Sequence, residues 1–497
     1  MSVAGKKACI VGAGFGGLAL GIRLQAAGAA TTIVEARDIP GGCAGYWQRE
    51  GFTFDAGPTV ITDTAALDSL WRLSGHDMGE DVELLRVHPY CRYNWPDGVT
   101  FDLSGDDTAL LREIARVAPE DIGGFEDFMR YCAHVYHDCF VRLASHPFPS
   151  RRAMARAAPA LIRHRTWRSL YDVVSRYIES PKLRQALSTQ TLRLGGNPMK
   201  QTALYALIHK MERESGIWCV RGGTNQLIAG LVRHFERLGG TIRLGDPVTR
   251  LHTLGNRVTE VETASRWKER FDVVASNADL MHTYRDLLGH TQGGNRAARK
   301  LSRKRYAPGA FLVHFGLEGS WPGIPHHTML LGPRYRGLME DIFDHGVLPQ
   351  DFAIFLDHPS VTDPSLAPEG KSVFTALVPV AHMGKLTVDW EQLGPMLEKR
   401  VLDEVGRRLI PDIHARIVTS FHYTPRDFSL DLNAYMGSAY GLEPRITQTA
   451  WLRPHNRDET MENFYLTGVN THPGPGVPAV IAGAKITAAL MLEDMAR

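Results

Sequence analysis

One stretch near the start of the chain, residues 8–35, limits the possible fold more than any other. An apolar run from Ala8 to Val11 is followed by Gly12, Gly14 and Gly17, which have the spacing of a dinucleotide-binding turn. The first glycine permits a tight turn, the second lets a pyrophosphate approach the backbone, and the third lets the next helix lie close to the strand. The pattern predicts a strand, a turn and a helix that begin a parallel sheet.

An acidic residue stands where such a unit needs one. The sequence predicts a helix from Phe15 to about Ala27, whose N-terminus faces the pyrophosphate, and a second strand that ends at Glu35. A carboxylate at this point accepts hydrogen bonds from an adenosine ribose and disfavours the 2′-phosphate of NADP. Arg37 lies close enough to leave the NADP alternative open. We therefore predict dinucleotide binding.

Composition narrows the class of protein further. The 497 residues, 44% hydrophobic, are enough for two or three domains with a large core. The net charge of +2 gives no reason to expect a nucleic-acid partner. The six cysteines are scattered, with no spacing typical of metal ligands, which suits a reducing compartment.

The apolar segments do not predict a membrane span. Lys6 and Lys7 precede an apolar run as in a signal peptide, but the glycine spacing and Glu35 explain that run better. The longest other candidate, Val477 to Leu492, is short for a span and contains Lys485. We expect a protein that does not cross a bilayer.

A second glycine loop follows the predicted second strand. Gly41 and Gly42 lie in the loop IPGGCAG, where paired glycines permit a close backbone approach to a ligand. A β-turn without a ligand is the simpler interpretation. Flavin-containing oxidoreductases, however, use such a loop after an acid-tipped strand to surround the AMP half and pyrophosphate of FAD.

Seven segments then resemble the bacterial-type phytoene desaturases, which are FAD-dependent carotenoid desaturases. They occur in order over nearly the whole chain, and five of them are distinctive. The segments are GAGFGGLALGIRLQAAG at 12–28, GFTFDAGPTVIT at 51–62, GGTNQLIAGLVRHFERLGG at 222–240, SNADLMHTYRDLL at 276–288, SLAPEG at 365–370, RPHNRD at 453–458 and YLTGVNTHPGPGVPAVIAGAK at 465–485.

This resemblance implies an α/β fold with three parts. They are a Rossmann-like FAD-binding domain of the flavin amine oxidase type, a mixed-sheet substrate domain, and a helical, membrane-facing subdomain. The expected FAD-binding domain is discontinuous, comprising residues 1–85, 215–290 and 455–497. The substrate domain takes 86–105 and 291–454, and the helical subdomain takes 106–214.

The resemblance also assigns a cofactor site. Val248 would contact adenine through its backbone, and the turn after the last strand would return to the flavin. The expected FAD-binding residues are Gly12, Gly14, Gly17, Glu35, Gly41, Gly42, Pro58, Thr59, Val248, Asn277, Gly468, Gly476 and Val477. The chain departs from the family pattern at four positions beside this site, which are Cys43, Val469, Asn470 and Pro475.

The activity implied by the resemblance is the stepwise desaturation of phytoene, a forty-carbon polyene, to neurosporene or lycopene. A hydride would pass to the flavin, a proton would leave the neighbouring carbon, and oxygen or a quinone would reoxidise the cofactor. The sequence contains no carboxylate pair or Ser-His-Asp arrangement, so we assign no catalytic residue. His326 and His327, with His314 and His382 nearby in the sequence, match no zinc motif and lack an evident acidic partner, so no metal site is predicted.

A basic segment, Val141 to Ile178, has the composition of an interfacial membrane element, although a solvated charged face is the alternative. Arginines alternate there with apolar residues, and a lipophilic substrate would favour docking on anionic lipid. The expected membrane-binding residues are Arg151, Arg152, Arg156, Arg163, Arg165, Trp167 and Arg168. The expected location is cytoplasmic, peripheral on the inner face of a bacterial cell membrane.

Two rival functions remain. One is a related flavin enzyme, such as a carotenoid isomerase, a desaturase of thirty-carbon or modified carotenoids, or an amine oxidase. The other is a non-catalytic prenyl-binding carrier that shares the fold, as in the GDP-dissociation inhibitors. The intact glycine turn and Glu35 argue against the carrier.

Overall fold

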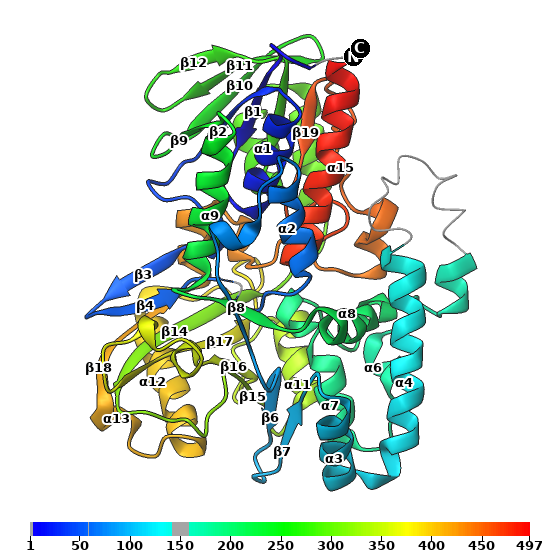
Figure 1. The fold of residues 1–497 in the computed structure, drawn as a ribbon, viewed down its shortest axis with the longest axis vertical. Coiled ribbons are helices and arrows are strands. Elements are labelled where there is room, and N and C mark those ends of the chain that lie inside the picture. The colour runs from blue at the N-terminus through cyan, green and yellow to red at the C-terminus, as the bar shows by residue number, and fades with distance from the viewer. Residues whose placement is uncertain (1–2, 58, 142–158) are drawn as a thin grey trace.

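The computed structural model describes residues 3–57, 59–141 and 159–497. Its upper half in Figure 1 is built on a parallel sheet with strand order β19-β13-β1-β2-β9. The strands come from three distant parts of the chain, in agreement with a discontinuous domain, although the exact domain division stays a prediction. Their bounds are Lys7–Val11 (β1), Ala30–Val34 (β2), Thr241–Arg243 (β9), Val273–Ser276 (β13) and Phe464–Leu466 (β19).

Helices cover this sheet and form its core. The apolar faces of α1, α9 and α15 pack with the buried side chains of β1 and β2. Apolar side chains of residues 248–261 cover the other face. Because both faces of the sheet are covered, its strands are short apolar runs rather than alternating ones. The helices are Phe15–Ala26 (α1), Thr64–Arg72 (α2), Thr224–Arg237 (α9) and Val477–Met495 (α15). The predicted first strand, turn and helix are confirmed.

One predicted strand is divided in the structure. The apolar and β-branched residues of 241–251 predict one strand, but β9 ends at Arg243 and β10 begins at Val248. Gly245 has a φ of 67°, and the buried Asp246 carboxylate accepts hydrogen bonds from the backbone N–H and the hydroxyl of Ser265. This turn sends β10 (Val248–Leu254) into a separate antiparallel sheet with β11 (Arg257–Thr263) and β12 (Lys268–Arg270).

The lower half of Figure 1 contains a mixed seven-stranded sheet with the order β18-β14-β17-β16-β15-β6-β7. The turn residues Pro96, Asp97 and Gly98 predict a hairpin, which the structure contains as β6 and β7. The strands are Cys91–Asn94 (β6), Thr100–Leu103 (β7), Gly309–Glu318 (β14), His327–Leu330 (β15), Ile354–Asp357 (β16), Lys371–Val380 (β17) and Ile417–Tyr423 (β18). Helix α12 (Trp390–Arg408) packs on one face.

Smaller elements join the two halves. Strands β3 (Tyr46–Arg49) and β4 (Phe52–Asp55) form one hairpin, and β5 (Leu84–Arg86) pairs with β8 (Trp218–Val220). Four further helices lie outside the helical region described next, and they are α10 (Gln292–Ser302), α11 (Tyr335–Glu340), α13 (Ile413–Arg416) and α14 (Pro425–Leu432).

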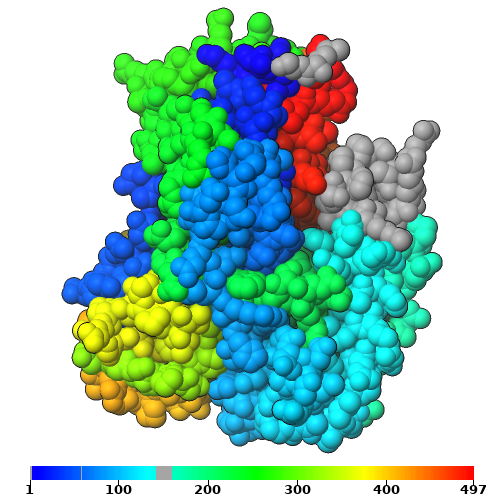
Figure 2. Space-filling model, viewed as in Figure 1, coloured from blue at the N-terminus to red at the C-terminus, as the bar shows by residue number. Residues whose placement is uncertain are grey.

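A helical region lies beside the mixed sheet, where Figure 2 shows its surface in cyan and blue-green. Its apolar core, which includes Phe128, Leu170 and Leu187, is continuous with Tyr93 and Phe101 of the mixed sheet, and its helices agree with the helical pattern predicted after residue 106. Its helices are Asp107–Val117 (α3), Ile122–Val135 (α4), Leu170–Val174 (α6), Pro181–Thr189 (α7) and Leu207–Ser215 (α8). Among the described residues, no helix is long and apolar enough to span a bilayer.

Candidate active site

A cavity of about 1230 Å³ runs between the parallel sheet and the mixed sheet. It brings together most of the residues that the sequence assigned to a cofactor, although they come from segments more than 400 positions apart. The predicted residues that line it are Gly12, Gly14, Glu35, Gly41, Gly42, Thr59, Val248, Asn277, Gly468, Gly476 and Val477. Gly17 is not part of the lining, and Pro58 lies outside the described residues.

Glu35 connects the end of β2 to the first glycine turn. Its side chain is buried, with Oε2 accepting from the backbone N–H of Ala13 at 2.7 Å and Oε1 from that of Arg37 at 3.0 Å. Each carboxylate oxygen has a second lone pair, so the group is still able to accept hydrogen bonds from a ribose. Gly12, with a φ of 98°, makes the turn that a side chain would strain.

Gly17 acts through packing. A Cβ atom at this position would lie 2.0 Å from the carbonyl oxygen of Gly12. The absence of a side chain therefore lets α1 lie directly on the turn, with its N-terminal amides and positive dipole end beside the cavity.

Asn277 connects the turns after the first and last strands. Its backbone N–H donates to Val11 at the end of β1. Its side-chain amide fills space that three glycines leave open, since a Cβ would lie 3.0 Å from it at Gly14, 2.4 Å at Gly16 and 2.8 Å at Gly468. The side chain of Asn277 therefore fixes the separation of the two turns.

The last helix begins at the cavity. The Gly/Pro-rich turn predicts a helix from about Ala479, whereas the helix starts two residues earlier, at Val477, with Gly476 as its N-cap. The prediction was late because Pro478 was included in the preceding turn, whereas proline is also suited to the first turn of a helix. The N-terminus of α15 is therefore beside the predicted flavin position.

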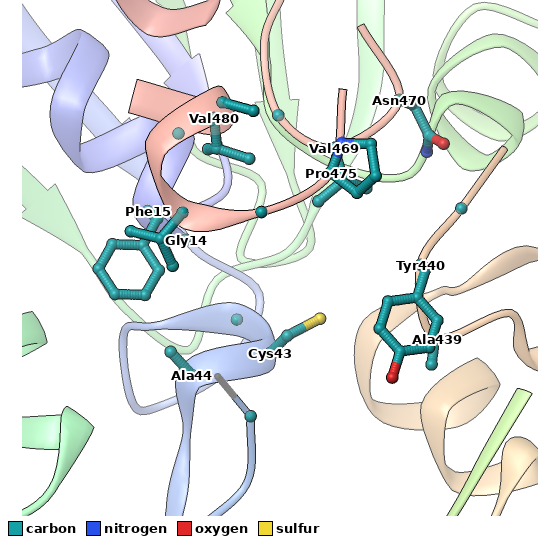
Figure 3. A pocket seen from close by; sticks show the side chains of 18 of the residues that line it. Gly14, Phe15, Cys43, Ala44, Ala439, Tyr440, Val469, Asn470, Pro475 and Val480 are labelled. Atoms are coloured by element: carbon teal, nitrogen blue, oxygen red, sulfur yellow. The ribbon is translucent and has the colours of Figure 1, made fainter. Parts of the chain in front are cut away.

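The four departures from the family pattern all line the cavity, and Figure 3 shows Cys43, Val469, Asn470 and Pro475 around it. The Cys43 thiol is exposed to the cavity, and desolvation by the surrounding protein raises its pKa, so it is neutral at pH 7. Asn470 has a structural partner, because its Oδ1 accepts from the backbone N–H of Leu442 at 2.8 Å.

The sequence did not reveal that Arg453 is a buried cation beneath the turn that precedes α15. Arg453 is 1% exposed and donates to the carbonyl oxygens of Val469 at 2.6 Å, Thr471 at 3.0 Å and Gln448 at 3.2 Å. It forms no salt bridge within the described residues. Burial lowers its pKa to about 10, which leaves it charged at pH 7. Its motif, RPHNRD, was the signal, but the motif does not reveal what the arginine contacts.

The part of the cavity away from the glycine turns is apolar. Side chains from the helical region and from the mixed sheet form this wall, including Leu161, Leu204, Ile208, Met211, Ala310, Leu312, Phe355, Leu377 and Phe428. Such a surface binds a hydrocarbon chain by removing it from water, at about 0.8 kcal/mol per CH₂. The described lining residues include no lysine.

Charged side chains interrupt this wall, namely the Arg193–Glu212 ion pair and the acidic Asp55 and Asp357. Burial raises the pKa of Asp55 to about 6, although its carboxylate accepts a hydrogen bond from the backbone N–H of Thr224 at the start of α9. Asp357 lies against His326 and His327, so the expectation that these histidines lack an acidic partner was wrong. His382 and His314 do not belong to that group.

Four of the predicted membrane-binding residues are described, and all four are exposed: Arg163, Arg165, Trp167 and Arg168. Trp167 is 54% exposed and its neighbour Ile162 is 62% exposed. Leu161, next in the chain, lines the cavity. Arg151, Arg152 and Arg156 lie outside the described residues.

Comparison with solved structures agrees with this fold. An oxidoreductase from Methanosarcina mazei superposes with a TM-score of 0.62 at 17% identity, with 96% of this chain and 98% of that chain covered. Cyclohexylamine oxidase from Brevibacterium oxydans gives a TM-score of 0.62 at 17% identity, with coverages of 98% and 99%. These likenesses support an α/β fold of the flavin amine oxidase type.

Sequence comparison gives the family. Residues 15–492 match the family of flavin containing amine oxidoreductases. A lycopene-forming phytoene desaturase from Paracoccus sp. is 48% identical over 100% of this chain and 99% of its own length, and one from Pseudescherichia vulneris is 47% identical over 99% and 100%. A neurosporene-forming phytoene desaturase from Cereibacter sphaeroides is 36% identical over 97% and 94%. The chain therefore belongs to the bacterial phytoene desaturases, within the flavin containing amine oxidoreductase family.

Proposed function

We propose that this protein is an FAD-dependent desaturase that converts phytoene stepwise to lycopene. The observation that carries the proposal is the end-to-end similarity to two lycopene-forming desaturases at 48% and 47% identity. The neurosporene-forming relative, at 36%, makes neurosporene the alternative end product. The apolar cavity, which opens from the glycine turns, has the chemistry that a hydrocarbon substrate requires.

The residues present fit FAD. Backbone at Gly12, Gly14, Gly41 and Gly42 leaves room for the pyrophosphate, and the buried Glu35 carboxylate stands where a ribose hydroxyl would donate. When bound, FAD supplies the redox chemistry by accepting a hydride from the substrate. The N-terminus of α15 and the Arg453 cation would stabilise negative charge near the flavin.

The cavity wall would orient the polyene and exclude water from it. Loss of a hydride from an allylic carbon makes the neighbouring proton strongly acidic, so a weak base or water suffices to accept it. The chain's own contribution is thus positioning rather than strong general-base catalysis. Oxygen or a quinone would then take the electrons from the reduced cofactor.

The rival functions make different demands. An amine oxidase would need polar recognition of its substrate and usually a lysine near the flavin. The described residues that line the cavity include no lysine. A non-catalytic carrier would need no flavin, and its purified form would be colourless. An isomerase or a desaturase of shorter or modified carotenoids would leave phytoene unchanged.

The function is tested by incubating the protein with FAD and phytoene in anionic liposomes, with a quinone or oxygen present. We expect coloured products that co-elute with lycopene, and partial reactions should show the intermediates with fewer double bonds. Unchanged phytoene in the presence of bound FAD would overturn the proposal in favour of another carotenoid substrate.

Glu35→Gln is expected to weaken FAD binding by roughly 10-fold to 100-fold, since hydrogen bonds to a charged acceptor contribute about 1.5–3 kcal/mol. The Glu35 carboxylate accepts from two backbone N–H groups. In the variant, the amide N–H₂ would face one of these donors and lose that hydrogen bond. Flavin fluorescence titration of the apoprotein measures the dissociation constant. Glu236→Gln, at an exposed position of α9, is the matched control, and equal FAD affinity in both variants would contradict the assignment.

We further propose that the protein docks on anionic membranes through Ile162 to Arg168. A forty-carbon hydrocarbon resides almost entirely in lipid, so the enzyme has to draw it from a bilayer. The exposed Trp167 and Ile162 would insert at the interface, while the arginines attract anionic headgroups. Leu161, which lines the cavity, lies beside this surface and gives the substrate a short path. Peripheral attachment to the inner face of a bacterial membrane follows from this proposal.

Replacing Arg163, Arg165 and Arg168 together by Gln should reduce binding to anionic liposomes by about 100-fold, at about 1 kcal/mol for each arginine. Liposome sedimentation at low salt measures the binding. The control removes three charges elsewhere, at Arg296, Arg299 and Arg303 around α10. The same loss in both triple variants would show non-specific charge attraction and would refute this docking surface.

A further inference from the structure

Three buried side chains meet at the wall of the cavity, beyond the glycine turns. His327 begins β15, His326 precedes it, and Asp357 ends β16. The antiparallel register places His327 directly opposite Asp357. Their exposed fractions are 1% for His326, 0% for His327 and 3% for Asp357. The desaturation proposed above uses none of the three.

The polar atoms of these side chains point at one another. Nε2 of His326 and Nε2 of His327 each lie 3.4 Å from Oδ1 of Asp357. None of these three atoms has a hydrogen-bond partner within the described residues. Buried polar atoms without partners destabilise a fold, so a group that satisfies all three at once would stabilise it.

The neighbouring contacts show which protonation state each imidazole has. Nδ1 of His327 is 3.1 Å from the carbonyl oxygen of Tyr90, which accepts only, so Nδ1 carries the proton and Nε2 presents a lone pair. Nδ1 of His326 is 2.8 Å from the Thr362 hydroxyl, which is able to accept in the same way. Burial lowers the pKa of both imidazoles, to about 3 for His327, so both are neutral at pH 7.

A single proton does not satisfy this arrangement. If Asp357 were protonated, its hydrogen would reach only one of the two Nε2 atoms, and 3.4 Å is longer than a normal hydrogen bond. A tetrahedral zinc ion with bonds of 2.0–2.1 Å, in contrast, separates its ligand atoms by about 3.4 Å. Neutral imidazole Nε2 atoms and a carboxylate oxygen are also the donors that zinc prefers.

We propose that His326, His327 and Asp357 form a site for one divalent transition-metal ion of the zinc type. Tyr90 and Thr362 orient the two imidazoles through Nδ1, as outer partners of metal-binding histidines do. Water from the cavity supplies the fourth donor, because Asp357 is part of the cavity lining. The ion links β15 to β16. Burial and the nearby Asp55 raise the pKa of Asp357 well above its usual range, and the ion would hold this carboxyl in its ionised form.

The test is a metal measurement that does not depend on desaturase activity. Protein from zinc-supplemented culture is purified, dialysed against a weak chelator and analysed for metals by mass spectrometry. Reloading with Zn²⁺ against a coloured chelator then gives the affinity, and X-ray absorption at the zinc edge gives the ligand types. We expect about one zinc per chain, bound by two imidazoles and oxygen donors.

Asp357→Asn is the informative variant, because an amide has the shape of a protonated carboxyl and preserves the local packing. Its zinc affinity should fall at least 10-fold while its circular dichroism and FAD content remain those of the wild type. His314→Gln, at a buried histidine of β14 outside the cluster, should bind zinc normally. No stoichiometric zinc in the reloaded wild type, or equal affinity in Asp357→Asn, would overturn the proposal.

Discussion

Replacing Arg453 by Met is expected to lower the free energy of unfolding by about 3 kcal/mol and to weaken FAD retention at least 10-fold. Arg453 donates to carbonyl oxygens of Val469, Thr471 and Gln448 in a fully buried position. Met fills the volume but leaves those carbonyl oxygens without donors. The free-energy cost of the unpaired carbonyls exceeds the gain from no longer burying a charged guanidinium. The turn that leads into α15 would lose its anchor.

Urea unfolding and flavin absorbance after ultrafiltration measure the two effects. Arg453→Lys keeps the charge but supplies fewer donors, so it should fall between Met and the wild type in FAD retention. Arg299→Met, at an exposed position of α10, should change neither quantity. Wild-type stability and FAD content in Arg453→Met would show that the turn does not depend on this residue.

Gly17→Ala has the second large effect. A single methyl group there would lie 2.0 Å from the Gly12 carbonyl oxygen, so α1 has to move away from the turn. We expect a loss of at least about 3 kcal/mol in stability and a loss of FAD binding of 10-fold or more, since overpacking against backbone is not relieved by a rotamer change.

Gly123→Ala is a closely matched control. Gly123 is also in the first turn of a helix, α4, and nothing lies within 4 Å of its Cβ position. Because alanine has the higher helix propensity, this variant should be as stable as the wild type or more stable, by up to about 1 kcal/mol. Similar losses in the two variants would mean that helix glycines in general, rather than the packing at Gly17, explain the effect.

The local motifs could be predicted because each depends on residues that are close together in the sequence. The glycines after β1 and the acid at the end of β2 have spacings that the sequence displays directly. The break at Gly245 was missed because Asp246 is held by the hydroxyls of Thr263 and Ser265. These two residues belong to a turn that is distant in the sequence.

The unpredicted parts of the site depend on contacts between distant segments. Arg453 is recognisable as part of a motif, but its role comes from the carbonyls of residues 448, 469 and 471, which a sequence does not place around it. His327 and Asp357 are 30 positions apart and meet only through the register of β15 with β16. Strand register is fixed by the packing of the whole sheet rather than by either strand alone.

The most direct test of the central claim is an anaerobic single-turnover experiment. Protein loaded with FAD is mixed with phytoene in anionic liposomes in the absence of any acceptor, and the flavin absorbance and the extracted carotenoids are followed together. The account predicts that the flavin bleaches while a product with one more double bond than phytoene forms in equal amount. A flavin that stays oxidised, with phytoene recovered unchanged, would contradict it.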